Sequence, residues 1–303
     1  MKKDGLKILV LVLGLAGVVM LAHWLDDHRQ DRNAQFSEER LYIDGATASR
    51  LTLAFNGLAA DWYWMRSLQY VGRKIINYED AHEGRFDLND LSSLDLNLLP
   101  SLLRVTTTLD PQFMAPYEYG AVILPESNQD EAIALLNSGI ATNPASWRLH
   151  QHLGYVYWQR HEYQRASEVY AEGARLPGAP PWMTAMSARM KAEGGSRDAA
   201  REIYRHLYEA SGDEAVKEMV TKQIMRLDWL DEREAIRRVL ADYRTQGGRC
   251  ASSWRDMAAA LRAARLRLEA TSGAPIDPSD TPYRLIKGGC DVELDENTKV
   301  PKR

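Results

Sequence analysis

The sequence feature that most constrains the fold is a repeat in the middle of the chain, with a period of about 34 residues. Gly120 is followed one period later by Gly154. The same interval joins five further pairs of residues: Tyr119 and Leu153, Ile123 and Tyr157, Ala132 and Ala166, Leu136 and Tyr170, and Gly139 and Gly173. A third copy keeps Ala188, Ala200 and Tyr204 at matching places. The predicted units are 113–146, 147–180, 181–214 and a degenerate fourth at 215–246.

The residue types at the shared places indicate two helices in each unit. Gly or Ala at the eighth and twentieth places removes side-chain bulk, so two helices can cross with their backbones close together. Pro144 and Pro177 end the second helix of the first two units, because Pro cannot continue a helix and disfavours it in the preceding residue. One helix pair buries only one face and needs stacked neighbours. The sequence therefore predicts an all-α stack of helical hairpins over 111–246.

This pattern resembles the tetratricopeptide repeat family. The residues that carry the resemblance are Leu153, Gly154, Tyr157, Tyr163, Ala166, Tyr170 and Gly173 in the second unit, and Gly120, Ala132, Gly139 and Pro144 in the first. The resemblance implies a right-handed solenoid whose concave wall is built by the first helix of each unit. It also implies a protein or peptide partner, since members of the family usually bind one, but it does not name that partner.

The resemblance further implies which side chains face the partner. They are Met114, Tyr117, Ala121 and Leu124 in the first unit, Arg148, Gln151, Tyr155, Trp158 and Gln159 in the second, and Trp182, Arg189 and Glu193 in the third. Aromatic and Arg side chains are enriched at protein contact sites. The alternative is that Tyr155 and Trp158 only pack against neighbouring helices. Family members that capture a C-terminal carboxylate use Lys and Asn where this chain has Gln151 and Tyr155, so such capture is not expected.

The N-terminus contains an apolar run that predicts a membrane anchor. Lys2, Lys3 and Lys7 precede it, and the run with its extension covers 8–25. Eighteen helical residues span roughly 27 Å, close to the ~30 Å hydrocarbon core of a bilayer. The lysines indicate a cytoplasmic N-terminus and an extracytoplasmic helical body, which is periplasmic if the cell is bacterial. The alternatives are a cleaved signal peptide and a soluble core helix.

Two flanking regions are expected around the repeats, after the anchor at 1–26 and a linker at 27–45. A divergent helical pair at 46–110 consists of a helix from Ala46 to Lys74, a polar loop at 76–90 and a helix from Leu91 to Leu109. The aromatic run from Ala60 to Trp64 indicates packing against the first repeat, or alternatively contact with a partner or with the membrane surface.

The C-terminal region, 247–303, is expected to cap the stack. A helix is expected from Ser252 to Leu268. Two short extended pieces around Gly288 and Gly289 are expected to form a hairpin, and the chain from Asn297 is expected to be frayed. Cys250 and Cys290 are the only cysteines, and export would favour a disulfide between them, worth roughly 4 kcal/mol. The alternative is two buried free thiols.

No known catalytic grouping is present in the sequence. Phosphate-binding Gly loops, CxxC pairs and HExxH motifs are absent. His150 and His152 point to different sides of a helix, so no metal site is expected, and each His is assigned a surface or capping role. The net charge of −4 gives no footprint for nucleic acid.

The sequence predicts a membrane-tethered extracytoplasmic scaffold rather than an enzyme, without a cofactor. It would assist an envelope complex of the pilus, cytochrome or secretion type, since such systems use anchored proteins of this repeat family. The alternatives are a structural subunit without a peptide groove and an enzyme with an unusual site. The oligomeric state stays open.

Overall fold

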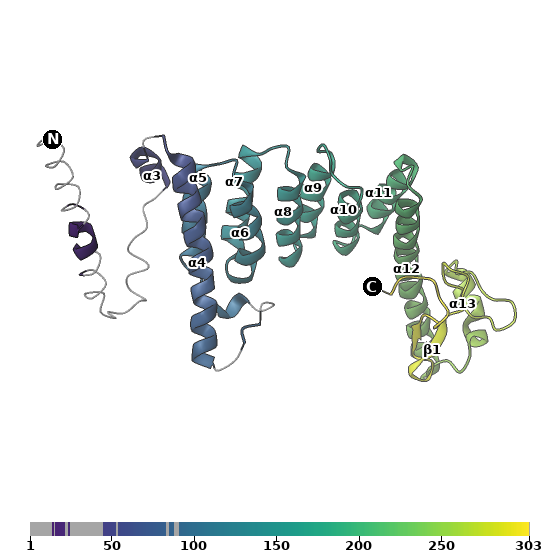
Figure 1. The fold of residues 1–303 in the computed structure, drawn as a ribbon. Coiled ribbons are helices and arrows are strands. Elements are labelled where there is room, and N and C mark those ends of the chain that lie inside the picture. Colours follow the sequence, from purple (N-terminus) through teal and green to yellow (C-terminus); the bar gives the residue numbers. More distant parts are fainter. Residues whose placement is uncertain are drawn as a thin grey trace, which may run out of the picture.

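The computed structural model describes residues 14, 16–21, 24, 45–52, 54–82, 85–87 and 91–302. These residues are mostly helical, so the predicted all-α class is confirmed. In Figure 1, helices α4 to α12 follow one another along a row in sequence order, with a small C-terminal module beside the last helix. Each helix of the row packs against the next one along the chain.

The N-terminal end of the row differs from the prediction. It contains α3 (Gly45–Leu51), α4 (Asn56–His82), the 3-10 turn η1 (Leu91–Ser93) and α5 (Leu99–Leu109). The predicted unbroken helix from Ala46 to Lys74 is wrong, because Ala54 adopts a φ of 79°, which an α-helix does not contain. The predicted loop at 76–90 is also partly wrong, because α4 continues to His82.

Helix α5 is shorter than expected and lies in the main core. The predicted helix from Leu91 starts only at Leu99, where Pro100 occupies the first turn, the place in a helix that tolerates a missing N–H. The helix then buries Leu102 and Leu103 almost completely. This core continues through α6 to α8.

The aromatic run on α4 divides between two directions. Trp64 packs edge-on against Phe113 and Tyr119 at ring-centroid distances of 5.9 and 5.2 Å, which is the predicted packing against the first repeat. Trp62 instead points outward and is 55% exposed. The predicted packing is therefore confirmed for Trp64, whereas contact of the run with a partner or the membrane surface stays a prediction.

Three helix pairs occupy the repeat region. They are α6 (Met114–Ser127) with α7 (Gln129–Thr142), α8 (Trp147–Gln159) with α9 (Tyr163–Ala174), and α10 (Trp182–Glu193) with α11 (Arg197–Ala210). The second helices begin one full period apart, at Gln129, Tyr163 and Arg197. The spacing found in the sequence is thus also the spacing of the helices.

The repeated glycines lie where helices meet. A Cβ placed on Gly120 would collide with Leu135 of α7, and one placed on Gly154 would lie 2.7 Å from the ring of Tyr170 on α9. Each of these glycines therefore admits the second helix of its own pair.

A second set of glycines repeats in the same way. A Cβ on Gly139 would lie 3.1 Å from Leu149, and one on Gly173 would lie 2.6 Å from Met183. Leu149 and Met183 are themselves separated by one period, on the first helix of the following pair. The contacts between successive pairs thus keep the period of the sequence.

The predicted fourth unit at 215–246 is wrong. Residues Glu214–Gly247 form one continuous helix, α12, of 34 residues. No Gly or Pro interrupts this stretch before Gly247, so nothing forces the turn that a hairpin needs. The helix ends at Gly248, whose φ of 66° closes the C-terminus in the left-handed conformation.

The C-terminal module packs along the second half of α12 (Figure 1). It contains η2 (Trp254–Met257), α13 (Ala258–Ala263) and a two-stranded antiparallel pair, β1 (Arg284–Ile286) with β2 (Asp291–Glu293). Cys250 and Cys290 form a disulfide. The predicted helix from Ser252 to Leu268 is wrong beyond Ala263, because Arg265 adopts a φ of 61° and the chain then runs into isolated bridges.

The predicted frayed end is also wrong for the residues that the structure describes. Val300 is only 3% exposed and belongs to the core of the C-terminal module. The Thr298 hydroxyl donates a hydrogen bond to the buried carboxylate of Asp277. Burial and this bond hold the end of the chain against the module.

The expected anchor at 8–25 falls mostly on residues outside the described part of the chain. Among the residues that are described, no helix is both long and apolar enough to cross a bilayer.

Candidate protein-binding surface

A network of side chains joins the first helices of all three pairs. Its members are Glu126 on α6, Tyr155, Trp158 and Gln159 on α8, and Arg189 and Glu193 on α10. We refer to these six residues as the aromatic network. They come from equivalent parts of helices α6, α8 and α10, which places them along one side of the row.

The strongest contacts of the aromatic network connect α8 to α10. The indole Nε1 of Trp158 donates to Glu193 Oε2 at 2.8 Å, and Arg189 Nε donates to Glu193 Oε1 at 2.7 Å. The guanidinium carbon of Arg189 lies 6.0 Å from the centroid of the Trp158 ring. One carboxylate thus orients an indole and a guanidinium that already face each other, an arrangement that favours a cation–π contact.

The other half of the aromatic network connects α8 to α6. Gln159 Nε2 donates to Glu126 Oε1 at 3.3 Å, and the rings of Tyr155 and Trp158 lie 5.5 Å apart. Tyr155 is 44% exposed, so its ring presents apolar area to solvent beside hydrogen-bonding groups. This combination suits contact with another polypeptide.

Burial shifts the pKa of two ionisable side chains on α8 and α9. Burial raises the pKa of Tyr170 to about 12, with Tyr155 acting in the same direction and Arg189 against it. Burial lowers the pKa of His152, although Glu118 opposes the shift. Both side chains are therefore neutral near pH 7.

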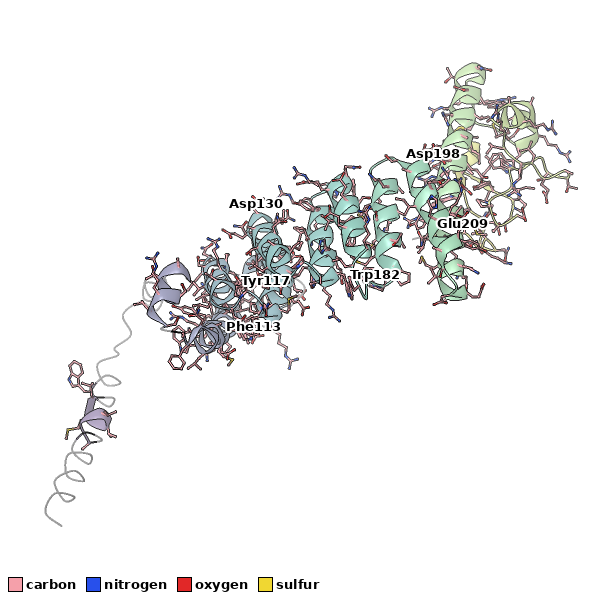
Figure 2. All side chains as sticks on the ribbon, turned by 90° about the horizontal axis from the view of Figure 1, so that it is seen from above. Phe113, Tyr117, Asp130, Trp182, Asp198 and Glu209 are labelled. Atoms are coloured by element: carbon pink, nitrogen blue, oxygen red, sulfur yellow. A yellow bond between two sulfur atoms is a disulfide. The ribbon has the colours of Figure 1, made fainter. Side chains whose placement is uncertain are left out.

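Two residues that were predicted to contact a partner are buried in the structure. Tyr117 and Leu124 have no exposed surface, so neither can touch a partner, and that prediction was wrong. The Tyr117 ring fills the space left by Gly139, and its hydroxyl donates to the carbonyl of Pro111 at 3.3 Å. Figure 2 shows Tyr117 among the packed helices rather than at the edge of the row. Leu124 belongs to the core shared with α5.

Two other residues of the first pair also contribute little surface. Ala121 is 3% exposed and therefore joins the core. Met114 is half-buried and packs against the same core. The contact positions implied by the resemblance thus fail mainly in the first pair, where they join or pack against the main core.

The remaining predicted residues form a second, separate group at the start of the helices. Trp182, at the beginning of α10, is 38% exposed and meets the edge of Trp147 at 5.9 Å. The guanidinium carbon of Arg148 lies 5.1 Å above the Trp147 ring. Gln151 is half-buried one turn further along α8. The sequence prediction did not include Trp147, although its place beside Arg148 could have indicated it.

Glu126 is the one member of the aromatic network that the sequence did not predict. It lies beyond the helix places that the family uses for contact, and only the bond from Gln159 brings it to the surface in question. No signal in the sequence identifies it.

The histidines do not assemble into a metal site within the described part of the chain. His150 is 6% exposed and is therefore not on the surface, and its Nδ1 lies 3.1 Å from the carbonyl oxygen of Ser146, the residue that precedes α8. His206 is exposed beside Glu202, at 3.1 Å.

No model of a known protein family matches the chain, and no curated protein is similar to it.

Proposed function

We propose that the chain is a protein-interaction scaffold of the tetratricopeptide repeat type. In this proposal the pairs α6–α7, α8–α9 and α10–α11 stack as a right-handed solenoid, and the first helices line the wall that binds a protein or peptide partner. The observation that carries it is the aromatic network, which runs from Glu126 through Trp158 to Glu193 without a break. Aromatic and Arg side chains of this kind dominate binding energy at protein interfaces.

We further propose that residues 8–25 tether the scaffold to a membrane and that the helical body lies on the extracytoplasmic side. The lysines before the apolar run support this orientation. The disulfide between Cys250 and Cys290 supports an oxidising compartment. A scaffold in this place would dock components during assembly of an envelope complex of the pilus, cytochrome or secretion type, and it would not itself be an enzyme.

Affinity capture from detergent-solubilised membranes tests the proposed binding surface. Replacing Trp158→Ala together with Arg148→Ala removes one ring of the aromatic network and the cation of the neighbouring group. The expected result is loss of the captured partner with little change in melting temperature. The matched control is Tyr208→Ala with Arg205→Ala, which removes an exposed ring and an exposed cation from α11. Equal loss in both double variants, or loss together with unfolding, would count against a dedicated surface.

A second candidate function is a structural subunit of a larger complex without a peptide groove. The observation that favours it is the outer side of α4, where Leu58, Trp62, Met65 and Ile76 are between 53% and 70% exposed. So much apolar surface on one helix indicates that something covers it. Crosslinks concentrated on 46–74 and 252–294, rather than on the aromatic network, would favour this candidate.

A further inference from the structure

The aromatic network continues into a hollow of about 230 Å³ between α10, α11 and α12. The hollow shares Arg189 and Glu193 with the network. Its apolar lining comes from Ala192, Leu227 and Leu230. Pockets for drug-sized ligands measure about 300–1,000 Å³, so this smaller hollow suits one or two side chains. We refer to it as the Arg226 pocket.

Three of the four charged residues that line the Arg226 pocket are cations. Arg189 is paired with Glu193 at 2.7 Å, and Arg197 is paired with Asp231 and Glu234 on α12. The side chain of Arg226 makes no hydrogen bond or ion pair with any residue that the structure describes. It is half-buried on α12, facing the apolar lining. One cation of the pocket is thus left without an acidic partner.

The positive charge acts on the interior of the pocket. Burial raises the pKa of Tyr204 to about 12; Arg189 and Arg226 oppose that shift, and Glu193 adds to it. The guanidinium charges of Arg189 and Arg226 therefore act on the phenol of Tyr204, which lines the pocket. A half-buried guanidinium attracts a carboxylate more strongly than one in open solvent, and its planar donors match both carboxylate oxygens.

The surrounding charges limit what can bind. Glu193 stands at one side of the pocket, and α12 carries Asp228, Asp231 and Glu234 nearby. These carboxylates would repel a polyanion such as a nucleic acid. A single carboxylate next to an apolar group avoids most of that repulsion.

We propose that the Arg226 pocket binds a peptide segment in which an acidic side chain pairs with Arg226 while an adjacent apolar side chain fills the hollow. This inference rests on the proposed scaffold function and specifies the partner at one end of the binding surface. The partner is an acidic and apolar peptide rather than a basic one.

An array of random dodecapeptides, probed with the full chain in detergent, tests this preference. The expected result is enrichment of Asp or Glu next to Leu, Ile, Met or Phe among the bound peptides. The peptide that binds most tightly is then synthesised in two forms, one with its Asp or Glu and one with Asn or Gln in its place. The binding of both forms is titrated by fluorescence anisotropy. The form with Asn or Gln should bind about tenfold more weakly. Equal binding of the two, or no enrichment on the array, would overturn the inference.

Variants of the chain locate the effect. Arg226→Gln should weaken the acidic peptide about tenfold, whereas Arg205→Gln on the outside of α11 should not change it. Arg226→Glu should instead bind the same peptide with Lys in place of its acid. Equal binding of the acidic peptide to Arg226→Gln and to the natural chain would also overturn the inference. Displacement of the peptide by a twelve-nucleotide single-stranded DNA would overturn it as well.

The aromatic network serves as the second arm of the test. If Trp158→Ala abolishes peptide binding while Arg226→Gln leaves it intact, the scaffold function stands and the pocket inference fails. If Arg226→Gln weakens binding while Trp158→Ala leaves it intact, the pocket stands and the proposed wall on α8 fails. Melting temperatures of all variants, followed by circular dichroism, separate binding losses from unfolding.

Discussion

Gly154 faces Tyr170 so closely that a Cβ on the glycine would lie 2.7 Å from the tyrosine ring. Tyr170 is 2% exposed and cannot move aside without displacing the core around it. The close crossing of α8 and α9 therefore requires a residue without a Cβ at position 154.

We expect Gly154→Ala to destabilise the chain by about 1–3 kcal/mol, because the added methyl group overpacks a filled crossing. The matched control is Gly72→Ala on α4, where a Cβ would meet no atom within 4 Å. That change should stabilise the chain by up to about 1 kcal/mol through helix propensity. Urea unfolding measures both. Equal effects of the two substitutions would show that the crossing is not tight.

Arg201 joins α11 to α12 through two carboxylates of α12, and it also pairs with a carboxylate on its own helix. Its Nε donates to Asp228 at 2.9 Å, and its two terminal nitrogens reach Asp198 and Asp231. We expect Arg201→Ala to lower the free energy of unfolding by roughly 1–2 kcal/mol, since it leaves two carboxylates of α12 without this cation.

Arg205→Ala is the control for this prediction. Arg205 lies one turn further along α11, is 59% exposed and, among the residues that the structure describes, pairs with Glu202 alone. Its loss should change the free energy by less than about 0.5 kcal/mol. A similar loss in both variants, measured by thermal unfolding, would contradict the role given to Arg201.

Asp291 gives the C-terminal module a dependence on pH. Hydrogen bonds from Arg237 and Lys287 hold the pKa of Asp291 well below its ordinary value. The folded state therefore favours the charged carboxylate. Its stabilisation is fully present above the ordinary Asp pKa of about 3.9 and is lost as the pH falls toward the lower folded pKa.

We expect Asp291→Asn to melt at a lower temperature than the natural chain at pH 7, and the difference to shrink as the pH falls below about 4. Asp242→Asn, which changes an exposed carboxylate of α12 outside the ion pairs of the described residues, should show no such trend. A difference for Asp291→Asn that stays constant between pH 7 and pH 3 would contradict the assignment.

The disulfide closes a sequence separation of 40 residues around η2 and α13. We expect reduction to lower the stability of the C-terminal module by about 2–4 kcal/mol. The double variant Cys250→Ala with Cys290→Ala should melt like the reduced natural chain and should not respond to reductant. A natural chain whose melting is unchanged by reductant would show that the bond contributes nothing.

The sequence predicted the helix pairs well because each repeated glycine lies where two helices touch. Gly139 and Gly173 each leave room for a residue of the following helix. The contact between successive helix pairs therefore requires a glycine at the same interval along the sequence. Tyr117 was misassigned because its place in the repeat does not reveal that its own second helix receives the ring. The stretch 215–246 contains no Gly or Pro at which a hairpin could turn, and it therefore forms part of one helix, α12, instead of the predicted fourth unit.

The C-terminal module was predicted least well because its order depends on contacts between distant residues. Thr298 is fixed by Asp277, and the Tyr283 hydroxyl donates to Glu232 on α12 at 2.7 Å. Neither contact has a periodic signature along the chain. Local patterns therefore suggested a frayed end where packing holds it.

Site-specific photocrosslinking in membranes tests the central claim most directly. A photoreactive residue is placed at Tyr155 and Glu126 in the aromatic network, and at Glu172 and Glu209, exposed positions on the second helices α9 and α11. We expect adducts with one partner from 155 and 126 and none from 172 and 209. Adducts from 172 and 209 alone, or from all four positions alike, would contradict a binding surface on the first helices.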